Sequence, residues 1–385
     1  MPRLSAILGF LFVLLAVAAT LAYEVRKDDR WDPDGYLYTR MMLVDTGSSE
    51  DAAHAAASRF FLSTPAARDP QARGFYTLQP PAWYESQYPL FRARPLYPEL
   101  AALAYPRLGF RAMKDVAAAG MLVAALALYV LLLLVAPPWL AACGALAGVA
   151  TPIARDAATM ALTDGVALAW WTICLAATAF YARRPTRAAL VTALAAAVLL
   201  ALTRPAIWLP LGAAAGFVVA AYRAGDPGRR RSATALLAGQ AAVAAGALLF
   251  TAAVHGAGFG TLVRWSYDWQ TAIHGPYVGH GAAAWYAAWL VRGLLTEPAT
   301  VIERGVPLFA LAIAAVGILA RRRDALVPVL LGAACVAPLA IVANPPDFRR
   351  ALELPLTPVV LTAVAAAVAA ALPAIGAARS ARADA

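Results

Sequence analysis

Charged residues are scarce in this sequence, and their scarcity excludes most soluble folds. Only 14% of the residues are charged and 62% are hydrophobic, whereas a soluble domain has about 25% charged and roughly 45–50% apolar residues. The composition therefore predicts a polytopic membrane protein, for which chain length is no guide to the number of domains. We treat residues 1–385 as a single membrane-embedded domain.

Metal and nucleotide motifs are also absent. The cysteines Cys143, Cys174 and Cys335 lie inside apolar runs without metal-type spacing, which predicts small core residues rather than a disulfide or a ligand set. The histidines show no i, i+4 metal pairing, and the sequence has neither a P-loop nor a dinucleotide-binding glycine fingerprint. We therefore expect no nucleotide hydrolysis and no resident cofactor.

Long apolar runs, in contrast, are abundant. A helix needs about 20 mostly apolar residues to cross a bilayer, and by that measure we predict ten spans. They cover approximately residues 4–23, 115–135, 139–154, 163–181, 188–203, 206–222, 233–254, 305–320, 326–343 and 356–375. The first span has features of a signal peptide, but its apolar run is long for that role, so we expect a retained anchor.

The distribution of arginine predicts the orientation. With the N-terminus inside, the inner segments contain only three acids, Asp226, Asp324 and Asp384. The arginines of those segments are Arg3, Arg183, Arg184, Arg187, Arg223, Arg229, Arg230, Arg231, Arg321, Arg322, Arg323, Arg379 and Arg382. Short loops rich in arginine stay cytoplasmic, so we expect both termini in the cytoplasm and the protein in the inner (cytoplasmic) membrane. Topology thus accounts for much of the basic charge behind the net charge of +10, and nucleic acid is not an expected partner.

The outer side then holds two long loops. The first extracytoplasmic loop spans residues 24–112 and the second 255–304, with a shorter piece at 344–355. Unstructured loops of such length are uncommon. We therefore predict helices in the first loop, at 51–62 and 98–108, the latter at the membrane interface.

The segment 31–47, WDPDGYLYTRMMLVDTG, is where we expect the chemistry. Asp32 and Asp34 lie two residues apart and are followed by Tyr36, Tyr38 and a short amphipathic run. A positioned carboxylate can serve as a general base, and two can hold a divalent ion through hard oxygen ligands. Asp-Pro and Asp-Gly are also ordinary turn formers, so a solvated loop is the alternative.

This segment resembles the first-loop motif of GT-C-type glycosyltransferases, integral-membrane enzymes that use polyprenyl-phosphate-linked sugars. The similarity is to the aminoarabinose-transferase and protein O-mannosyltransferase branches, which are glycosyltransferase family 39-like. Their motif has an Asp beside a second acid, a Tyr four residues on and an amphipathic helix ending near a Gly. Asp32, Tyr36 and Gly47 hold that register. Pro33 stands where the family usually has Glu, so Asp34, with Tyr38 four residues on, is the second candidate.

Further stretches resemble the same families. Residues 92–109 look like the basic stretch that follows, with Arg94 in place of Lys, and Arg suits a bidentate phosphate contact. Asp156 lies in the turn after the third span, Arg204 lies between the fifth and sixth, and Asp164 suits a helix cap. Arg349 and Arg350 resemble the arginine-bearing loop that closes the site. For each cation, anchoring to lipid headgroups is the alternative.

The resemblance implies an all-α, GT-C-like bundle of about ten transmembrane helices whose long first loop carries amphipathic helices. It implies a polyprenyl-phosphate sugar donor, an acceptor hydroxyl, and Asp32 as base with Asp34 as second candidate. Arg94, Tyr36, Asp156, Arg204, Arg349 and Arg350 are the implied contacts to substrate or lipid phosphate, and the matched branches are metal-independent.

Two other functions fit part of the sequence. A flippase or transporter of lipid-linked sugar would usually place ionisable residues in the middle of the membrane, but the predicted spans are almost free of charge in their interiors. A non-catalytic membrane scaffold is consistent with Pro33 in the motif. The sequence names neither the sugar nor the acceptor.

Overall fold

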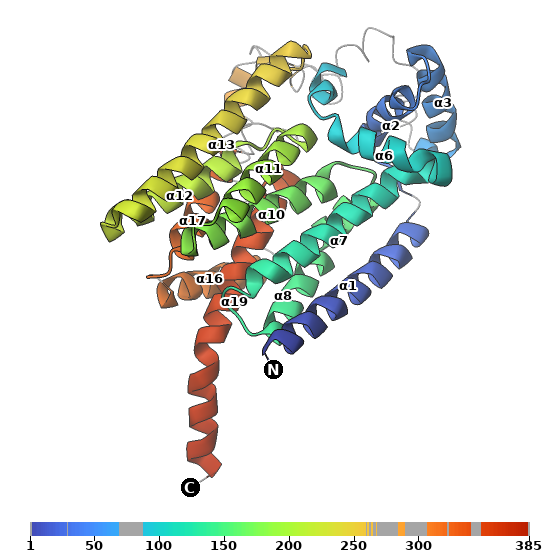
Figure 1. The fold of residues 1–385 in the computed structure, drawn as a ribbon. Coiled ribbons are helices and arrows are strands. Elements are labelled where there is room, and N and C mark those ends of the chain that lie inside the picture. The colour runs from blue at the N-terminus through green and yellow to red at the C-terminus, as the bar shows by residue number, and fades with distance from the viewer. Residues whose placement is uncertain are drawn as a thin grey trace.

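The protein is all-helical throughout the part that the structure describes (Figure 1). The computed structural model describes residues 2–28, 30–68, 88–258, 260–261, 263–264, 267, 284–288, 306–321, 323–339 and 348–383. Its helices are α1 (Pro2–Lys27), α2 (Pro33–Asp45), α3 (Glu50–Ser63), η1 (Pro65–Arg68), α6 (Leu96–Leu108), η2 (Gly109–Arg111), α7 (Ala112–Leu132), α8 (Pro138–Ala150), α9 (Pro152–Thr159), α10 (Asp164–Arg183), α11 (Arg187–Thr203), α12 (Trp208–Ala224), α13 (Pro227–Ala253), α16 (Val306–Ala320), α17 (Leu326–Val336) and α19 (Phe348–Ala383).

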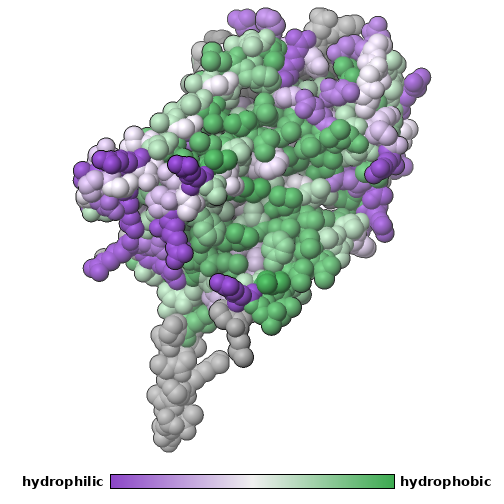
Figure 2. Space-filling view, viewed as in Figure 1, coloured by the Kyte–Doolittle hydropathy of each residue, from purple (hydrophilic) through white to green (hydrophobic). Residues whose placement is uncertain are grey.

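The lengths and composition of these helices support a membrane protein. Five helical segments in the described residues are long and apolar enough to cross a bilayer. They are Arg3–Lys27, Leu96–Leu132, Asp164–Arg183, Pro227–Ala253 and Glu353–Leu372. The remaining five predicted spans fall on apolar helices of 10–17 residues. Figure 2 shows hydrophobic residues across the middle of the visible face, with hydrophilic residues gathered towards its ends.

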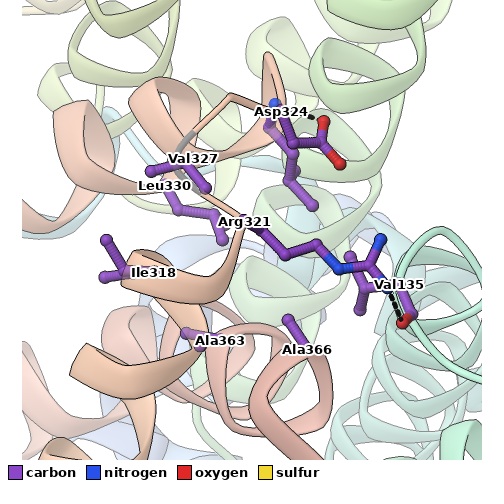
Figure 3. Close-up of a pocket in the computed structure, with 10 residues that line it drawn as sticks. Val135, Ile318, Arg321, Asp324, Val327, Leu330, Ala363 and Ala366 are labelled. Atoms are coloured by element: carbon purple, nitrogen blue, oxygen red, sulfur yellow. Dashed lines mark hydrogen bonds between the residues drawn. The ribbon is translucent and has the colours of Figure 1, made fainter. Parts of the chain in front are cut away.

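Two arginine-rich turns meet the α7–α8 turn at one end of the bundle. The Arg183 guanidinium, at the end of α10, donates to the Leu134 carbonyl at 2.7 Å and pairs with Asp324 in the α16–α17 turn. Arg321 donates to the Val135 carbonyl at 2.9 Å (Figure 3). The cavity beside Arg321 is only about 10 Å³, which leaves room for about one water molecule. Figure 3 therefore shows a structural contact between turns, not a ligand site.

The opposite end carries a second, smaller core built from α2, α3, α6 and the start of α7. Tyr36, Met42, Phe61 and Tyr97 are among its fully buried side chains. The helices predicted at 51–62 and 98–108 are confirmed as α3 and α6. This core holds the first-loop segment against the membrane bundle.

A sharp bend separates α6 from α7. Gly109 has a φ of +57°, a backbone conformation that glycine adopts without steric cost. The Tyr97 hydroxyl donates to the Met113 carbonyl at 2.8 Å, so α6 folds back towards α7 instead of continuing it. The exposed face of α6 carries Leu103, which is 81% accessible.

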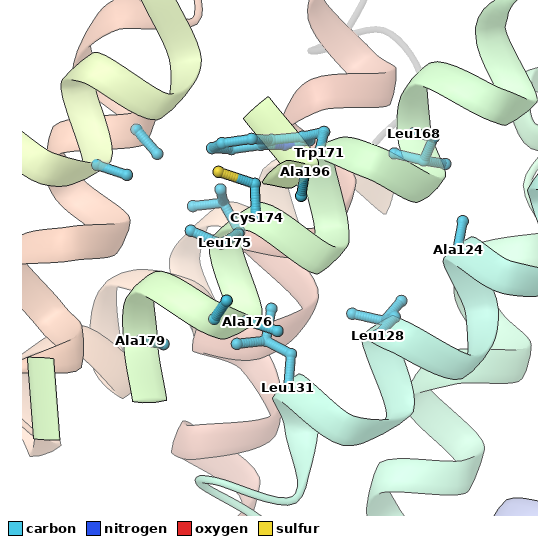
Figure 4. Packing of buried hydrophobic residues seen from close by; sticks show 14 of the residues in the cluster. Ala124, Leu128, Leu131, Leu168, Trp171, Cys174, Leu175, Ala176, Ala179 and Ala196 are labelled. Atoms are coloured by element: carbon cyan, nitrogen blue, oxygen red, sulfur yellow. The ribbon is translucent and has the colours of Figure 1, made fainter. Parts of the chain in front are cut away.

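The main core takes residues from most helices of the bundle, and at its contact between α7 and α10 small residues let the backbones approach. A Cβ added to Gly120 of α7 would lie 2.6 Å from the Val166 nitrogen of α10. Figure 4 shows Leu128 and Leu131 of α7 facing the side chains of α10. Small residues at such contacts are the usual means of close helix packing in membranes.

The cysteine prediction is correct for one residue and wrong for two. Cys174 of α10 is fully buried in this core, where Figure 4 places it beneath Trp171. Cys143 and Cys335 are exposed, because they lie on the outward faces of the short apolar helices α8 and α17. All three thiols are free.

The contact between α12 and α17 predicts a large difference between two glycine substitutions. A Cβ on Gly216 would overlap the Pro328 carbonyl oxygen, whereas a Cβ on Gly246 of α13 would meet nothing within 4 Å. We expect Gly216→Ala to destabilise the protein by about 1–3 kcal/mol through overpacking. Gly246→Ala should be neutral or slightly stabilising. The thermal midpoint of the purified protein in detergent measures both, and equal shifts would contradict the packing described.

Candidate functional site

A cluster of ionised side chains joins the end of α1 to α9. Arg30 donates to both oxygens of Asp28, with Nη2 at 2.7 Å from Oδ2, and the same Nη2 lies 3.0 Å from Oδ1 of Asp156. The Thr159 hydroxyl donates to Oδ2 of Asp28 at 2.7 Å. One arginine thus bridges two acids that are 128 positions apart in sequence (156 − 28).

Asp28 is held ionised by this cluster. Burial alone would raise the pKa of its carboxyl, but hydrogen bonds from Arg30 and Thr159 outweigh burial and lower the pKa from 3.8 to about 2. A carboxylate locked in this way is a poor proton acceptor near neutral pH. Its position therefore indicates a structural function, which is to hold the residues that follow α1 against α9.

The lowered pKa predicts an acid-sensitive part of the stability. Because the folded-state pKa lies below the unfolded value, Asp28 stabilises the fold above about pH 4, and the contribution is lost as pH falls from 3.8 towards 2. A shift of this size is worth about 2 kcal/mol. We expect Asp28→Asn to lower the thermal midpoint at pH 7 and to flatten its decline between pH 4 and pH 2. An unchanged decline in the variant would contradict the assignment.

A buried lysine also contacts the residues that follow α1. Lys114, near the start of α7, is 3% exposed and donates to the Asp28 carbonyl oxygen at 2.8 Å. Its ammonium also lies 4.7 Å from the centre of the Trp31 ring, a cation–π contact. Lys114 therefore connects the membrane bundle to the first residues of the 31–47 segment.

Asp32 and Asp34, the two acids of that segment, lie in different environments. Asp32 is the N-cap of α2, and its carboxylate accepts the backbone N–H of Asp34 at 2.9 Å. Asp34 lies in the first turn of α2 and is exposed. A Cβ on Gly35 would lie 3.4 Å from the Ala161 carbonyl oxygen, so this turn packs on the corner between α9 and α10. The structure thus assigns a capping contact to Asp32 and leaves Asp34 at the surface.

Arg94 lies near Asp34. Its Nη1 donates to the Tyr38 hydroxyl at 3.1 Å, and its guanidinium lies 5.4 Å from the centre of the Phe91 ring. Burial lowers the pKa of Arg94, but Tyr38 and Asp34 raise it by more, so the net shift is upward and the group is a permanent cation. The Nε atom is buried without a hydrogen-bond partner among the described residues.

Asp164 and Arg204 form an ion pair at the same end of the bundle. Asp164 is the first residue of α10, where a negative charge suits the helix dipole, and it is 4% exposed. Arg204 directly follows α11, and its side chain is 23% exposed. The sequence suggested a substrate contact or a headgroup anchor for Arg204, and neither alternative included Asp164. The ion pair holds the α11–α12 turn against the start of α10.

Tyr36 lies away from these groups. It is fully buried, and its hydroxyl lies 2.7 Å from Nδ1 of His54 and 3.1 Å from the Ser58 hydroxyl. Burial and the charge of Arg40 lower the pKa of His54, which favours the neutral imidazole that can accept this hydrogen bond. The phenol thus binds α3 to α2, and we leave Tyr36 out of the ligand contacts proposed below.

Two predicted regions lie outside the described residues. The backbone of Arg349 and Arg350 belongs to the first turn of α19, but their side chains are not described. Most of the loop at 255–304 lies outside as well. Of the predicted site residues, the structure brings Asp34 close to Arg94, and it joins Asp156 to Arg30 and Arg204 to Asp164.

Sequence reasoning missed four residues of this region: Asp28, Arg30, Lys114 and Thr159. The charges of 28–30 directly follow an apolar span, which resembles an ordinary polar flank. Lys114 was the stronger signal, because a lysine at the start of an apolar helix needs a partner or an escape to water. Its partner is 86 positions away, and only the fold reveals it.

No protein-family model matches the chain, and no curated protein matches it. The chemistry must therefore be judged from the residues themselves. Within the described ranges, no three His, Cys, Asp or Glu side chains are grouped as a metal site. What the arrangement offers is an exposed carboxylate beside a permanent cation, which suits proton removal next to an anionic group.

Proposed function

We propose that this protein is a GT-C-like membrane glycosyltransferase that takes a sugar from a polyprenyl-phosphate-linked donor and adds it to an acceptor hydroxyl. The observation that supports this most is that the charge of Asp34 acts on Arg94, at the end of the bundle opposite the arginine-rich turns. The acid and the cation of two separately matched motifs lie within electrostatic reach of each other. The proposal includes a bundle of ten spans in the bacterial inner membrane, with both termini cytoplasmic.

The proposed reaction exchanges one bond at the anomeric carbon of the sugar. The acceptor oxygen forms a bond to that carbon, and the bond between the carbon and the phosphate oxygen breaks. The acceptor proton passes to a carboxylate, and the leaving polyprenyl phosphate keeps the bonding electron pair. A positioned base and a cation aimed at the developing negative charge are the two aids that such a reaction needs.

We assign the base to Asp34 because of its exposure and because Asp32 caps the helix. The family motif ranks Asp32 first, but the Asp32 carboxylate accepts the backbone N–H of Asp34 as a helix cap. Asp34 is exposed, and its charge acts on Arg94 and raises the pKa of that guanidinium. Asp32 remains the second candidate, and the Discussion gives the comparison that separates the two.

Arg94 is the proposed contact to the donor phosphate. Its Nη1 is bound to Tyr38, which leaves further guanidinium N–H groups for phosphate oxygens. Arginine also presents these donors as a planar fork that matches phosphate geometry. We do not assign Asp156 and Arg204 a direct contact to the reacting groups, because each forms an ion pair with a residue of the protein.

The test is sugar transfer in membranes that contain the full chain. A panel of polyprenyl-phosphate sugars serves as donors, and free polyprenyl phosphate is the measured product. Consumption of at least one donor supports the proposal. If no donor is consumed and the purified protein moves lipid-linked sugar between the leaflets of a vesicle, the flippase function replaces it. If it neither consumes nor moves a donor and binds no polyprenyl phosphate, a scaffold function replaces it.

A further inference from the structure

A lateral groove of about 580 Å³ lies between α1, α7, α10 and α11. Its volume falls within the range of small-molecule sites, roughly 300–1,000 Å³. The walls are almost entirely apolar, with Phe10, Val130 and Phe180 among the larger side chains. Arg184 and Thr186 lie at one end, where α10 stops and α11 begins. The groove therefore combines an apolar channel with a cationic end.

The small residues along the groove explain its depth. Ala127 of α7 and Ala176 and Ala177 of α10 line it where longer side chains would close it. Phe180 is 41% exposed, although it lies on a helix otherwise largely buried. An apolar channel on the side of a membrane bundle matches the chemistry of a lipid acyl chain.

The charge at its end is available for a ligand. The Arg184 side chain is exposed and makes no hydrogen bond or ion pair to any described residue. Its neighbour Arg183 differs, because its guanidinium is bound to the Leu134 carbonyl and to Asp324. No acidic residue lines the groove, and Arg187, the first residue of α11, is a second exposed cation three positions further along the chain. The end of the groove therefore favours an anion.

We propose that the groove binds an anionic phospholipid of the leaflet at the arginine-rich end. One acyl chain lies between α7 and α10, and the headgroup phosphate accepts hydrogen bonds from Arg184 and Thr186. A zwitterionic lipid fills the channel equally well, but it gains less binding free energy from Arg184 because it carries no net charge. Basic pockets between transmembrane helices are a known means of recognising acidic headgroups. The bound lipid joins α1 and α7 to the α10–α11 turn and stabilises the fold by mass action.

This inference is independent of the proposed reaction. The groove lies in the half of the bundle nearer the arginine-rich turns, whereas Asp34 and Arg94 lie at the opposite end. A protein that failed to transfer sugar would still show the lipid preference described.

The experiment compares lipid binding by the full chain and three variants. Protein purified in detergent and stripped of lipid is titrated with phosphatidylglycerol or phosphatidylcholine, and retained lipid is counted by native mass spectrometry. We expect tighter binding of phosphatidylglycerol. Arg184→Gln should weaken that binding about fivefold, the effect of one cation near an anionic lipid surface. Phosphatidylcholine binding should change little.

The controls separate the groove from general surface charge. Arg223→Gln removes an equally exposed arginine in the last turn of α12, outside the groove, and should leave both affinities unchanged. Ala127→Phe should block the channel and reduce retention of both lipids. Equal affinities for the two lipids in the unmodified protein would overturn the proposal. So would equal losses in Arg184→Gln and Arg223→Gln.

Discussion

Asp34→Asn is expected to reduce sugar transfer by roughly 10²–10⁴-fold, the usual contribution of a positioned general base. The amide keeps the size and hydrogen-bonding shape of the side chain but cannot take the acceptor proton. Folding and membrane insertion should be unaffected, because Asp34 is exposed and lies in the first turn of α2. Initial rates of donor consumption in membranes measure the effect, with protein level and thermal midpoint recorded alongside.

Asp32→Asn is the matched control for that result. Asn is as good an N-cap as Asp, so the hydrogen bond to the Asp34 backbone can be kept. We expect this variant to retain most of its activity and its stability. If Asp32→Asn loses transfer and Asp34→Asn keeps it, the assignment to Asp34 is wrong and the register of the family motif is right.

Arg204→Ala is expected to cause the largest loss of stability. It leaves the Asp164 carboxylate, which is 4% exposed, without its cationic partner. Removing one member of a buried ion pair typically costs about 3–5 kcal/mol. The thermal midpoint in detergent should fall accordingly, and the start of α10 should become more open to hydrogen exchange.

Three further variants show whether this loss comes from the ion pair. Arg223→Ala removes an exposed arginine and should change the stability by less than about 0.5 kcal/mol. The double variant Asp164→Ala, Arg204→Ala should be more stable than Arg204→Ala alone, because no buried charge is left unpaired. Asp164→Ala alone completes the comparison. A double variant whose loss of stability equals the sum of the losses in Asp164→Ala and Arg204→Ala would contradict the pairing.

The apolar helices could be predicted from the sequence because each is a local property. A run of apolar residues and its flanking arginines lie within one stretch of chain, and each predicted span falls on an apolar helix. The helices at 51–62 and 98–108 were predictable for the same reason, and they were confirmed as α3 and α6. The prediction also ended the second of these helices at residue 108, where α6 ends in the structure.

The contacts of the site could not be predicted, because they join distant stretches. Asp28 meets Thr159, and Arg94 meets Tyr38. Composition gives no information on which acid faces which cation. The same limit explains Tyr36, whose place in the motif suggested a ligand contact but whose hydroxyl lies between α2 and α3. The cysteines show a further limit, since a helix in a bilayer has an apolar outer face and an apolar run does not distinguish lipid from core.

The bend at Gly109 has a consequence for how a substrate would be found. It lays α6 at the surface of the bundle with Leu103 turned outward, and Arg94 lies just before its first turn. On the proposed function, α6 sets the height of the guanidinium at the layer of lipid phosphates. A polyprenyl-linked donor then arrives by diffusion in two dimensions, and its rate of capture depends on its mole fraction in the leaflet and not on its bulk concentration. Diluting the donor with other lipids would slow the enzyme even when the total amount of donor is unchanged.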